Sequence, residues 1–311
     1  MTKAWAPFGQ LIQSVGLCAF DVGARGNTKM DLRPIASGVD WVCLEPDQHA
    51  PLGDAGYWRS VTHSADAVAA SSGSFALNLY RQRGCSSRFE ADGQLAARFA
   101  RGDYYQLDEV VDIAARPLDD IAETLSRRVD FLKIDVQGME VECFQGAHNA
   151  LERDLVGIRT EVSFFPIYRS QPLFAEVDQA LRPYGLHPMR WLEMHSWRRR
   201  DRSKWPRLGD SQLPFSRGQL VHADVLYLLQ PEDLPKSTED ELKRIVRLGL
   251  VSLCYDLLDH AEACFSVDEV LEYVRPLLPD PLEAVAAVSH ARVAQTRWSR
   301  LLERTRDRLQ R

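Results

Sequence analysis

The strongest constraint on the fold is a series of short apolar runs that alternate with helical stretches from residue 14 to about residue 190. Continuous apolar strands with helices between them are typical of a parallel sheet that helices cover on both faces. The sequence therefore predicts an α/β domain with helices at Met139–Leu151 and Leu173–Tyr184. The expected strands are Ser14–Asp21, Val39–Glu45, Trp58–His63, Phe75–Tyr80, Val129–Val136, Gly157–Phe164, Leu186–Met194 and Ala223–Leu229.

The last two of these strands lie far apart in the sequence, with no strong helix between them. This spacing leaves antiparallel pairing open for them. Residues 198–217, rich in Arg, Pro, Ser and Trp, look like a long loop. Loops of that length are usually functional or disordered.

After residue 235 the pattern becomes helical only. Thr238 with Glu241, and Ser266 with Glu269, each fit a capping box that marks a helix start. Pro281 suits the first position of a third helix. We therefore expect one domain over residues 1–235 and a helical appendage over 236–311.

The appendage carries an apolar stripe that includes Leu242, Ile245, Val246 and Leu250. An apolar stripe on a helix needs a partner surface. The sequence leaves two partners open, the α/β domain of the same chain or a second subunit in a homo-oligomer.

Composition narrows the class of protein further. The 311 residues carry a net charge of −6, which argues against a nucleic-acid partner. No run approaches the roughly 20 apolar residues that span a bilayer, and no secretory signal is evident. The six cysteines form no CxxC pair, so we expect reduced thiols in a cytoplasmic protein and no structural zinc.

The sharpest motif follows the first predicted strand. A glycine at a strand-to-helix turn lets the backbone approach a ligand closely, and open α/β sheets bind ligands at the carboxyl ends of their strands. Glu45 ends the second strand about 24 residues further on, near the roughly 20 residues expected for a ribose-binding acid. The expected cofactor-binding residues here are Asp21, Gly23, Ala24, Arg25, Gly26, Asn27, Glu45 and Pro46.

Two features favour S-adenosylmethionine over NAD as the ligand. The turn lacks the G-x-G-x-x-G pattern that holds a pyrophosphate, and Asp21 suits a ligand with positive charge on sulfur and amine. Asp135 adds a third acid at the end of a central strand, and Gly138 then opens a helix. Charges at the ends of buried strands usually have a reason, so Asp135 joins the expected cofactor site.

In these motifs the chain resembles the FkbM-type methyltransferases over about residues 16–230. The resemblance implies a Rossmann-like class I methyltransferase fold with a mostly parallel seven-stranded sheet and helices on both faces. It also implies adenosylmethionine as methyl donor and O-methylation of a glycan or secondary metabolite. The residues that carry it are Asp21–Ala24, Leu44–Pro46, Gly84–Ser87, Pro117–Asp120, Phe131–Glu140, Phe144 with Gly146 and Ala147, Glu161 and Ala223–Leu226.

The chain departs from the family's pattern at two places. The family usually continues its first turn with Asn, any residue and Gly, whereas this chain has Arg25, Gly26 and Asn27. Where the family often has Glu, this chain has Gln137. We therefore expect Arg25 either to pair with the methionine carboxylate of the cofactor or to lie on the surface.

Methylation of a hydroxyl needs an in-line approach to the methyl group and a base that takes the proton. Asp135 and Glu161 are the predicted catalytic residues. Asp135 has three open roles: contact with the methionine end of the cofactor, acceptance of the proton, or binding of a divalent metal together with Glu161. The structural alternatives are a helix cap for Asp135 and an ion pair for Glu161.

Other side chains remain as alternatives. His63, His195 and His222 are alternative bases, and Lys133 is expected to reach across the sheet to an acid. Ser86 and Ser87 either contact the acceptor or form a polar turn. The Arg198–Arg202 run, with Trp197 and Trp205, either grips an acidic glycan or is a solvated basic loop.

Two other functions compete with methyl transfer. The first is a non-catalytic binding protein on a methyltransferase fold. The second is an NAD-dependent sugar oxidoreductase, which would need a G-x-G-x-x-G turn and a Tyr/Lys hydride-transfer pair that the sequence does not show.

Overall fold

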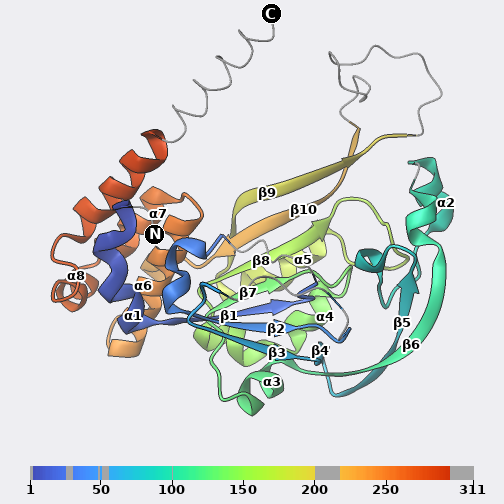
Figure 1. The fold of residues 1–311 in the computed structure, drawn as a ribbon, viewed down its shortest axis with the longest axis horizontal. Coiled ribbons are helices and arrows are strands. Elements are labelled where there is room, and N and C mark those ends of the chain that lie inside the picture. The colour runs from blue at the N-terminus through green and yellow to red at the C-terminus, as the bar shows by residue number, and fades with distance from the viewer. Residues whose placement is uncertain are drawn as a thin grey trace, which may run out of the picture.

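A seven-stranded sheet forms the centre of the computed structural model (Figure 1), which describes residues 3–25, 31–47, 50, 56–99, 101–199 and 218–294. The strand order is β3-β2-β1-β7-β8-β10-β9. These strands are β1 (Leu17–Val22), β2 (Val39–Leu44), β3 (Ser60–Ser64), β7 (Phe131–Ile134), β8 (Gly157–Ser163), β9 (His187–Trp197) and β10 (Gln219–Leu228).

The sheet is mostly parallel, as the sequence predicts. β3, β2, β1, β7 and β8 run parallel to their neighbours, whereas β10 is antiparallel to both β8 and β9. Every residue of β1 and β2 is buried, which explains why both strands read as continuous apolar runs.

The helices are short in the first two thirds of the chain and longer near its C-terminal end. Their bounds are α1 (Gly9–Val15), α2 (Gly93–Arg98), α3 (Leu118–Thr124), α4 (Glu140–Gln145), α5 (Phe174–Leu181), α6 (Glu239–Cys254), α7 (Leu258–Phe265) and α8 (Asp268–Val274). Residues 281–294 are also helical. Between β1 and β2 the described chain has only the short 3-10 helix Arg33–Gly38.

Several predicted boundaries differ from those of the structure, and three of the differences are instructive. Residues 14 and 15 belong to the end of α1 and not to the strand. Gly16 takes a φ of +53°, which ends the helix, and β1 begins at the next residue. The predicted helix Met139–Leu151 is interrupted as α4 ends at Gly146, where a Cβ would lie 2.1 Å from the backbone oxygen of Ala69. The expected cap at Ser266 is also wrong, since α8 begins after Val267 without a side-chain cap.

Residues 67–116 form an extension that lies beyond the carboxyl ends of the parallel strands (Figure 1). It contains a three-stranded sheet in the order β4-β6-β5, made of β4 (Ala67–Val68), β5 (Gly73–Tyr80) and β6 (Leu107–Arg116). The prediction identified β5 but missed β6, whose residues are mostly exposed and therefore lack an apolar pattern.

The C-terminal helices gather with α1 at the opposite end, where β1 begins (Figure 1). Ile245, Val246 and Leu250 are at most 2% exposed and belong to the same apolar core as the sheet. The capping box of Thr238 and Glu241 is present at the start of α6. The stripe is thus covered within this chain, while a separate unit over residues 236–311 and an oligomer stay predictions.

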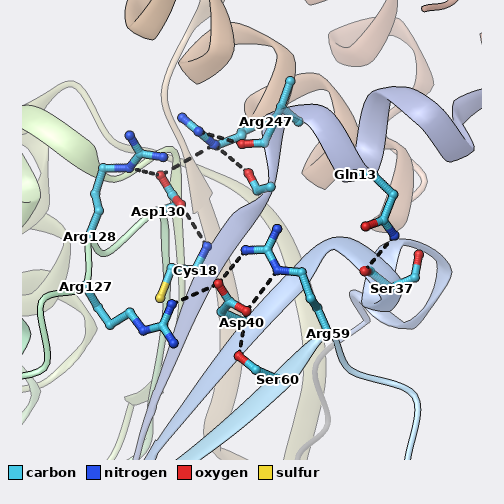
Figure 2. Close-up of polar contacts among 12 residues, drawn as sticks. Gln13, Cys18, Ser37, Asp40, Arg59, Ser60, Arg127, Arg128, Asp130 and Arg247 are labelled. Atoms are coloured by element: carbon cyan, nitrogen blue, oxygen red, sulfur yellow. Dashed lines mark hydrogen bonds and ion pairs between the residues drawn. The ribbon is translucent and has the colours of Figure 1, made fainter.

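A polar cluster ties α6 to the amino ends of the strands (Figure 2). The Asp130 carboxylate accepts hydrogen bonds from the backbone N–H of Cys18 (2.7 Å) and from Arg128 Nε (2.7 Å). Arg247 of α6 donates to the backbone oxygens of Val15 and Gly16, each at 2.7 Å. Its Nε also lies 3.7 Å from Asp130, so one buried carboxylate is faced by two guanidinium groups.

Asp40 makes a second such centre beside the first (Figure 2). Its carboxylate accepts hydrogen bonds from Arg59 Nε (2.9 Å), Arg127 Nη1 (3.1 Å) and Ser60 Oγ (2.5 Å). The hydrogen bond from Arg59 holds the pKa of Asp40 below its ordinary value, against the opposing effect of burial.

Within the residues that the structure describes, no helix has both the length and the apolar character needed to cross a membrane.

Candidate functional site

The turns that follow β1 and β7 touch at the carboxyl edge of the sheet. Gly23 has a φ of +76°, and a Cβ on it would lie 2.1 Å from the backbone oxygen of Asp135. The Asp135 N–H donates to the oxygen of Val22 (3.1 Å), and the N–H groups of Gly23 and Ala24 both donate to the oxygen of Leu44. Only glycine fits this approach, which brings the ends of β1, β2 and β7 together.

Asp21 is enclosed rather than open at this edge. It is 0% exposed, and its Oδ1 lies 2.9 Å from Lys133 Nζ. Burial alone would lower the pKa of Lys133, but the charges of Asp21 and then Asp135 raise it. The expected pairing of Lys133 with an acid across the sheet is confirmed. Contact between Asp21 and a cofactor stays a prediction that requires this ion pair to open.

The second acid, Glu45, lies at the tip of β2 beside Arg25 and Asp47. Arg25 pairs with Asp47, and its Nη2 lies 3.9 Å from Glu45 Oε1. That oxygen also accepts a hydrogen bond from the Asp47 N–H (2.9 Å), and burial raises the pKa of Glu45. Of the other predicted cofactor-binding residues, Pro46 follows directly and is half-buried, whereas Gly26 and Asn27 lie outside the residues that the structure describes.

The two predicted catalytic acids are joined through a side-chain amide. Gln137 Nε2 donates to Asp135 Oδ1 (2.6 Å) and to Glu161 Oε1 (3.2 Å). The structure thus brings Asp135 and Glu161, from adjacent strands, into one cluster. Burial, followed by repulsion from Asp135, raises the pKa of Glu161 to about 7.

An imidazole completes the cluster. His222 Nδ1 lies 2.9 Å from Glu161 Oε2, on the side away from Gln137. Burial alone would lower the pKa of His222, but Glu161 and then Asp135 raise it above the ordinary value. The ring of His195 stacks on His222 with centroids 4.5 Å apart and an interplanar angle of 12°. Two of the three alternative bases therefore lie beside the predicted acids.

Ser87 of the extension over residues 67–116 and Tyr168 both hold Gln137 in place. The backbone of Gln137 has a φ of +54°, and its oxygen accepts a hydrogen bond from Ser87 Oγ (2.7 Å). The Tyr168 hydroxyl lies within hydrogen-bond distance of two acceptors, Gln137 Oε1 (3.0 Å) and the backbone oxygen of Cys85 (2.7 Å). An amide at position 137 is thus fixed at both its nitrogen and its oxygen.

Glu140 stabilises the same turn from inside the protein. It is 4% exposed, and its Oε1 accepts from the N–H groups of Val136 and Gly138, both at 3.2 Å. Burial raises the pKa of Glu140 to about 8. These contacts use the carboxyl group in the turn that carries Gln137, which is a structural role.

The remaining candidates lie apart from the cluster or are used in the fold. Ser86 Oγ accepts from the Tyr80 N–H (3.3 Å), so both serines serve the turn structure. His63 is exposed at the end of β3. Arg199 lies over the ring of Phe99 at 5.4 Å, while the rest of the expected basic loop, residues 200–217, is outside the described residues.

Comparison with known proteins assigns the central part of the chain. Residues 45–187 match the family model described as the methyltransferase FkbM domain. The central part of the chain is therefore similar to an FkbM methyltransferase domain. No curated protein and no solved structure matches the chain. The resemblance that the sequence motifs indicate is therefore confirmed.

The matched range divides the cluster. It includes Glu45, Asp135, Gln137 and Glu161, and it begins after the turn that contains Gly23. His222, on β10, lies beyond it. The matched range thus contains the acids and the amide, whereas the flanking segments contain the glycine turn and the imidazole.

The sequence alone offers His222 only as one of three alternative bases, and it indicates no role for Gln137. His222 lies on β10, two residues before Asp224. Because β10 pairs with β8, His222 lies opposite Ser163. Pairing between strands 60 residues apart cannot be read from local patterns. Among the described residues, no group of three or more His, Cys, Asp or Glu side chains is arranged to hold a metal ion.

Proposed function

We propose that this methyltransferase uses S-adenosylmethionine to methylate a hydroxyl group of a glycan or secondary metabolite. The observation that carries the proposal is the cluster of Asp135, Gln137, Glu161 and His222 beside the Gly23 turn. It combines a base with acids at the edge of the sheet where nucleotide-like ligands bind. No step of the proposal depends on a metal ion.

The donor groups at this edge fit the cofactor. Glu45 Oε1 is occupied by Asp47, while among the described residues Oε2 of Glu45 accepts no hydrogen bond. A carboxylate oxygen at the tip of β2 suits the ribose hydroxyl groups. Asp135 is the proposed contact for the positively charged methionine end, because opposite charges attract most strongly where water is scarce.

When bound, the cofactor would supply an electrophilic methyl group on a positively charged sulfur. The chain's own part is to orient the acceptor and to remove its proton as the new bond to oxygen forms. Glu161 faces His222 Nδ1, which leaves Nε2 as the nitrogen that accepts the proton. The proton moves from the hydroxyl to His222, and Glu161 stabilises the resulting imidazolium.

Gln137 keeps the two acids in different roles. Its amide donates to both of them and carries no charge, so Asp135 and Glu161 stay close without a third carboxylate. Arg25 is proposed to leave Asp47 for the methionine carboxylate when the cofactor binds, and the present pairing shows that this guanidinium reaches the tip of β2. A cytoplasmic setting is supported by six cysteines that are all free thiols.

Thermal-shift titration with adenosylmethionine, its demethylated product and NAD tests the proposal. Both adenosyl compounds should raise the melting temperature as their concentration exceeds Kd, and NAD should not. Glu45→Gln should weaken this shift, since the amide nitrogen cannot accept from a ribose hydroxyl. Glu152→Gln, at an exposed acid that pairs with His148, is the matched control.

A shift with NAD alone would indicate an oxidoreductase. No shift with any of the three compounds would indicate a binding protein on a methyltransferase fold, and either result would overturn the proposal.

A further inference from the structure

A cavity opens beside β8 and β9. Its volume is about 620 Å³, within the range of pockets that hold small molecules. Its walls come from three parts of the chain: the segments before β2 and β3, the middle of β8 and β9, and the end of α6 together with Arg292. We call it the Arg159 pocket after the buried guanidinium on its floor.

Arg159 is held in place before any ligand arrives. It is 2% exposed, and its Nε and Nη2 donate to Asp224 Oδ2 at 2.9 and 2.6 Å. Nη2 also lies 3.3 Å from Glu193, and Nη1 lies 3.6 Å from Asp31. A guanidinium fixed by three carboxylates is a rigid part of the wall.

Charges around the pocket balance. Four arginines line it, and four carboxylates either line it or pair with Arg159: Arg33, Arg159, Arg190 and Arg292 against Asp31, Glu193, Asp224 and Asp256. Asp256 is paired with Arg292 at 2.8 Å, and Arg33 lies over the ring of Tyr57 at 4.7 Å. A site with no excess charge does not favour a phosphate or a free carboxylate.

Two buried donors in the wall lack an acceptor. Among the described residues, Trp58 Nε1 and the Tyr255 hydroxyl are buried and donate to no acceptor, while the Tyr255 oxygen faces the Arg159 guanidinium. Tyr255 is 1% exposed, and its ring is fixed by stacking on Phe131 with centroids 6.0 Å apart. Buried polar groups are normally paired, so these two donors point to a ligand that supplies acceptor oxygens.

The pocket adjoins the catalytic cluster along two strands. Arg159 lies two residues before Glu161 on β8, and side chains two apart on a strand share a face. Glu193 of the pocket lies 3.7 Å from His195, which stacks on His222. A ligand in the pocket can therefore extend toward the proposed base.

We propose that the Arg159 pocket binds a neutral saccharide unit of the methyl acceptor, an inference that rests on the proposed function. Hydroxyl oxygens accept hydrogen bonds from Trp58 and Tyr255, while hydroxyl protons are donated to the carboxylates of the wall. The half-buried indole ring of Trp58 supplies a flat apolar surface for the C–H face of the sugar ring. The charge balance selects a neutral sugar over a phosphorylated or acidic one.

Saturation-transfer NMR tests the binding without requiring the natural acceptor. The probes are the methyl α-pyranosides of glucose, mannose and fucose, with glucose 6-phosphate and glucuronate as charged counterparts. At least one neutral glycoside should bind, with a lower Kd than either charged sugar. Equal or tighter binding of the charged sugars, or no binding of any neutral glycoside at about 20 mM, would overturn the proposal.

Two conservative variants locate the binding. Tyr255→Phe and Trp58→Phe each remove one donor and keep an aromatic ring, and each should raise the Kd of the glycoside about 2- to 12-fold, the usual worth of one hydrogen bond. Tyr227→Phe is the matched control, because it also removes a buried hydroxyl from an aromatic ring and Tyr227 does not line the pocket. Equal affinities in all three variants and the wild type would place the sugar elsewhere.

The methyl donor is measured in the same samples. If glycosides bind and adenosylmethionine causes no thermal shift, the proposed function fails while the pocket assignment stands. If adenosylmethionine binds and no glycoside does, the pocket assignment fails alone.

Discussion

Two polar clusters lie at opposite ends of the parallel strands, and their carboxylates have different partners. At the amino ends, the carboxylates of Asp40 and Asp130 face arginines. At the carboxyl ends, Asp135 and Glu161 face each other across the amide of Gln137.

The contrast shows in the pKa values. Hydrogen bonding to Arg59 lowers the pKa of Asp40, whereas burial and Asp135 raise that of Glu161 to about 7. A carboxylate paired with an arginine helps to hold structural elements together. Buried carboxylates that face each other, with shifted pKa values, are typical of catalytic sites. We therefore expect carboxylates that face arginines to serve the fold, and carboxylates that face each other to serve the chemistry.

The largest expected effect is the loss of catalysis when the cluster at the carboxyl ends is changed. His222→Gln should lower the rate of methyl transfer about 10²- to 10⁴-fold, the usual contribution of a positioned base. The measurement is the initial rate with radiolabelled adenosylmethionine and cell extract as the source of acceptor. His148→Gln is the control, because His148 forms an exposed pair with Glu152 at 3.4 Å and should leave the rate unchanged. A rate within twofold of the wild type for His222→Gln would remove the imidazole from the mechanism.

At the amino ends the corresponding loss should be of stability. Asp130→Ala leaves the buried Arg247 guanidinium and the Cys18 N–H without their carboxylate, so the free energy of unfolding should fall by about 3–5 kcal/mol. Urea unfolding measures it, with Asp108→Ala as a control, since the exposed pair of Asp108 and Arg83 should contribute less than about 1 kcal/mol. A loss below about 1 kcal/mol for Asp130→Ala would show that this cluster does not hold the fold.

A smaller effect concerns how the free energy of unfolding depends on pH, which should have opposite signs for the two clusters. A raised pKa in the folded state makes the native protein bind the Glu161 proton more tightly, so stability falls as pH rises from about 4.5 to about 7. Glu161→Gln removes this term and should reduce the fall in unfolding free energy between pH 5 and pH 8 by roughly 1–3 kcal/mol. Urea unfolding at several pH values provides the measurement.

Asp40→Asn is the informative counterpart, because its lowered pKa has the opposite sign. The carboxylate of Asp40 stabilises the protein above its ordinary pKa of 3.8 and loses that contribution as pH falls further. The variant should therefore be less stable at neutral pH and lose less in acid. Parallel pH curves for the two variants would contradict the distinction drawn between the clusters.

Much of the fold follows from the sequence because β1, β2, β7 and β8 are buried and read as apolar runs. The strands of the extension escape prediction where exposure removes the apolar alternation, as in β6. Helix ends escape it where a distant backbone contact decides them, as at Gly146 against Ala69.

The candidate site divides in the same way. Asp135 and Glu45 follow from local pattern, because each acid ends a predicted buried strand. His222 and Gln137 do not, because their roles arise only when β10 pairs antiparallel with β8 and the extension over residues 67–116 closes on the turn after β7. Local sequence thus identifies the acids of the site, while long-range pairing decides which of them share an amide, an imidazole or an arginine. That choice of partner is what gives the two ends of the sheet their different chemistry.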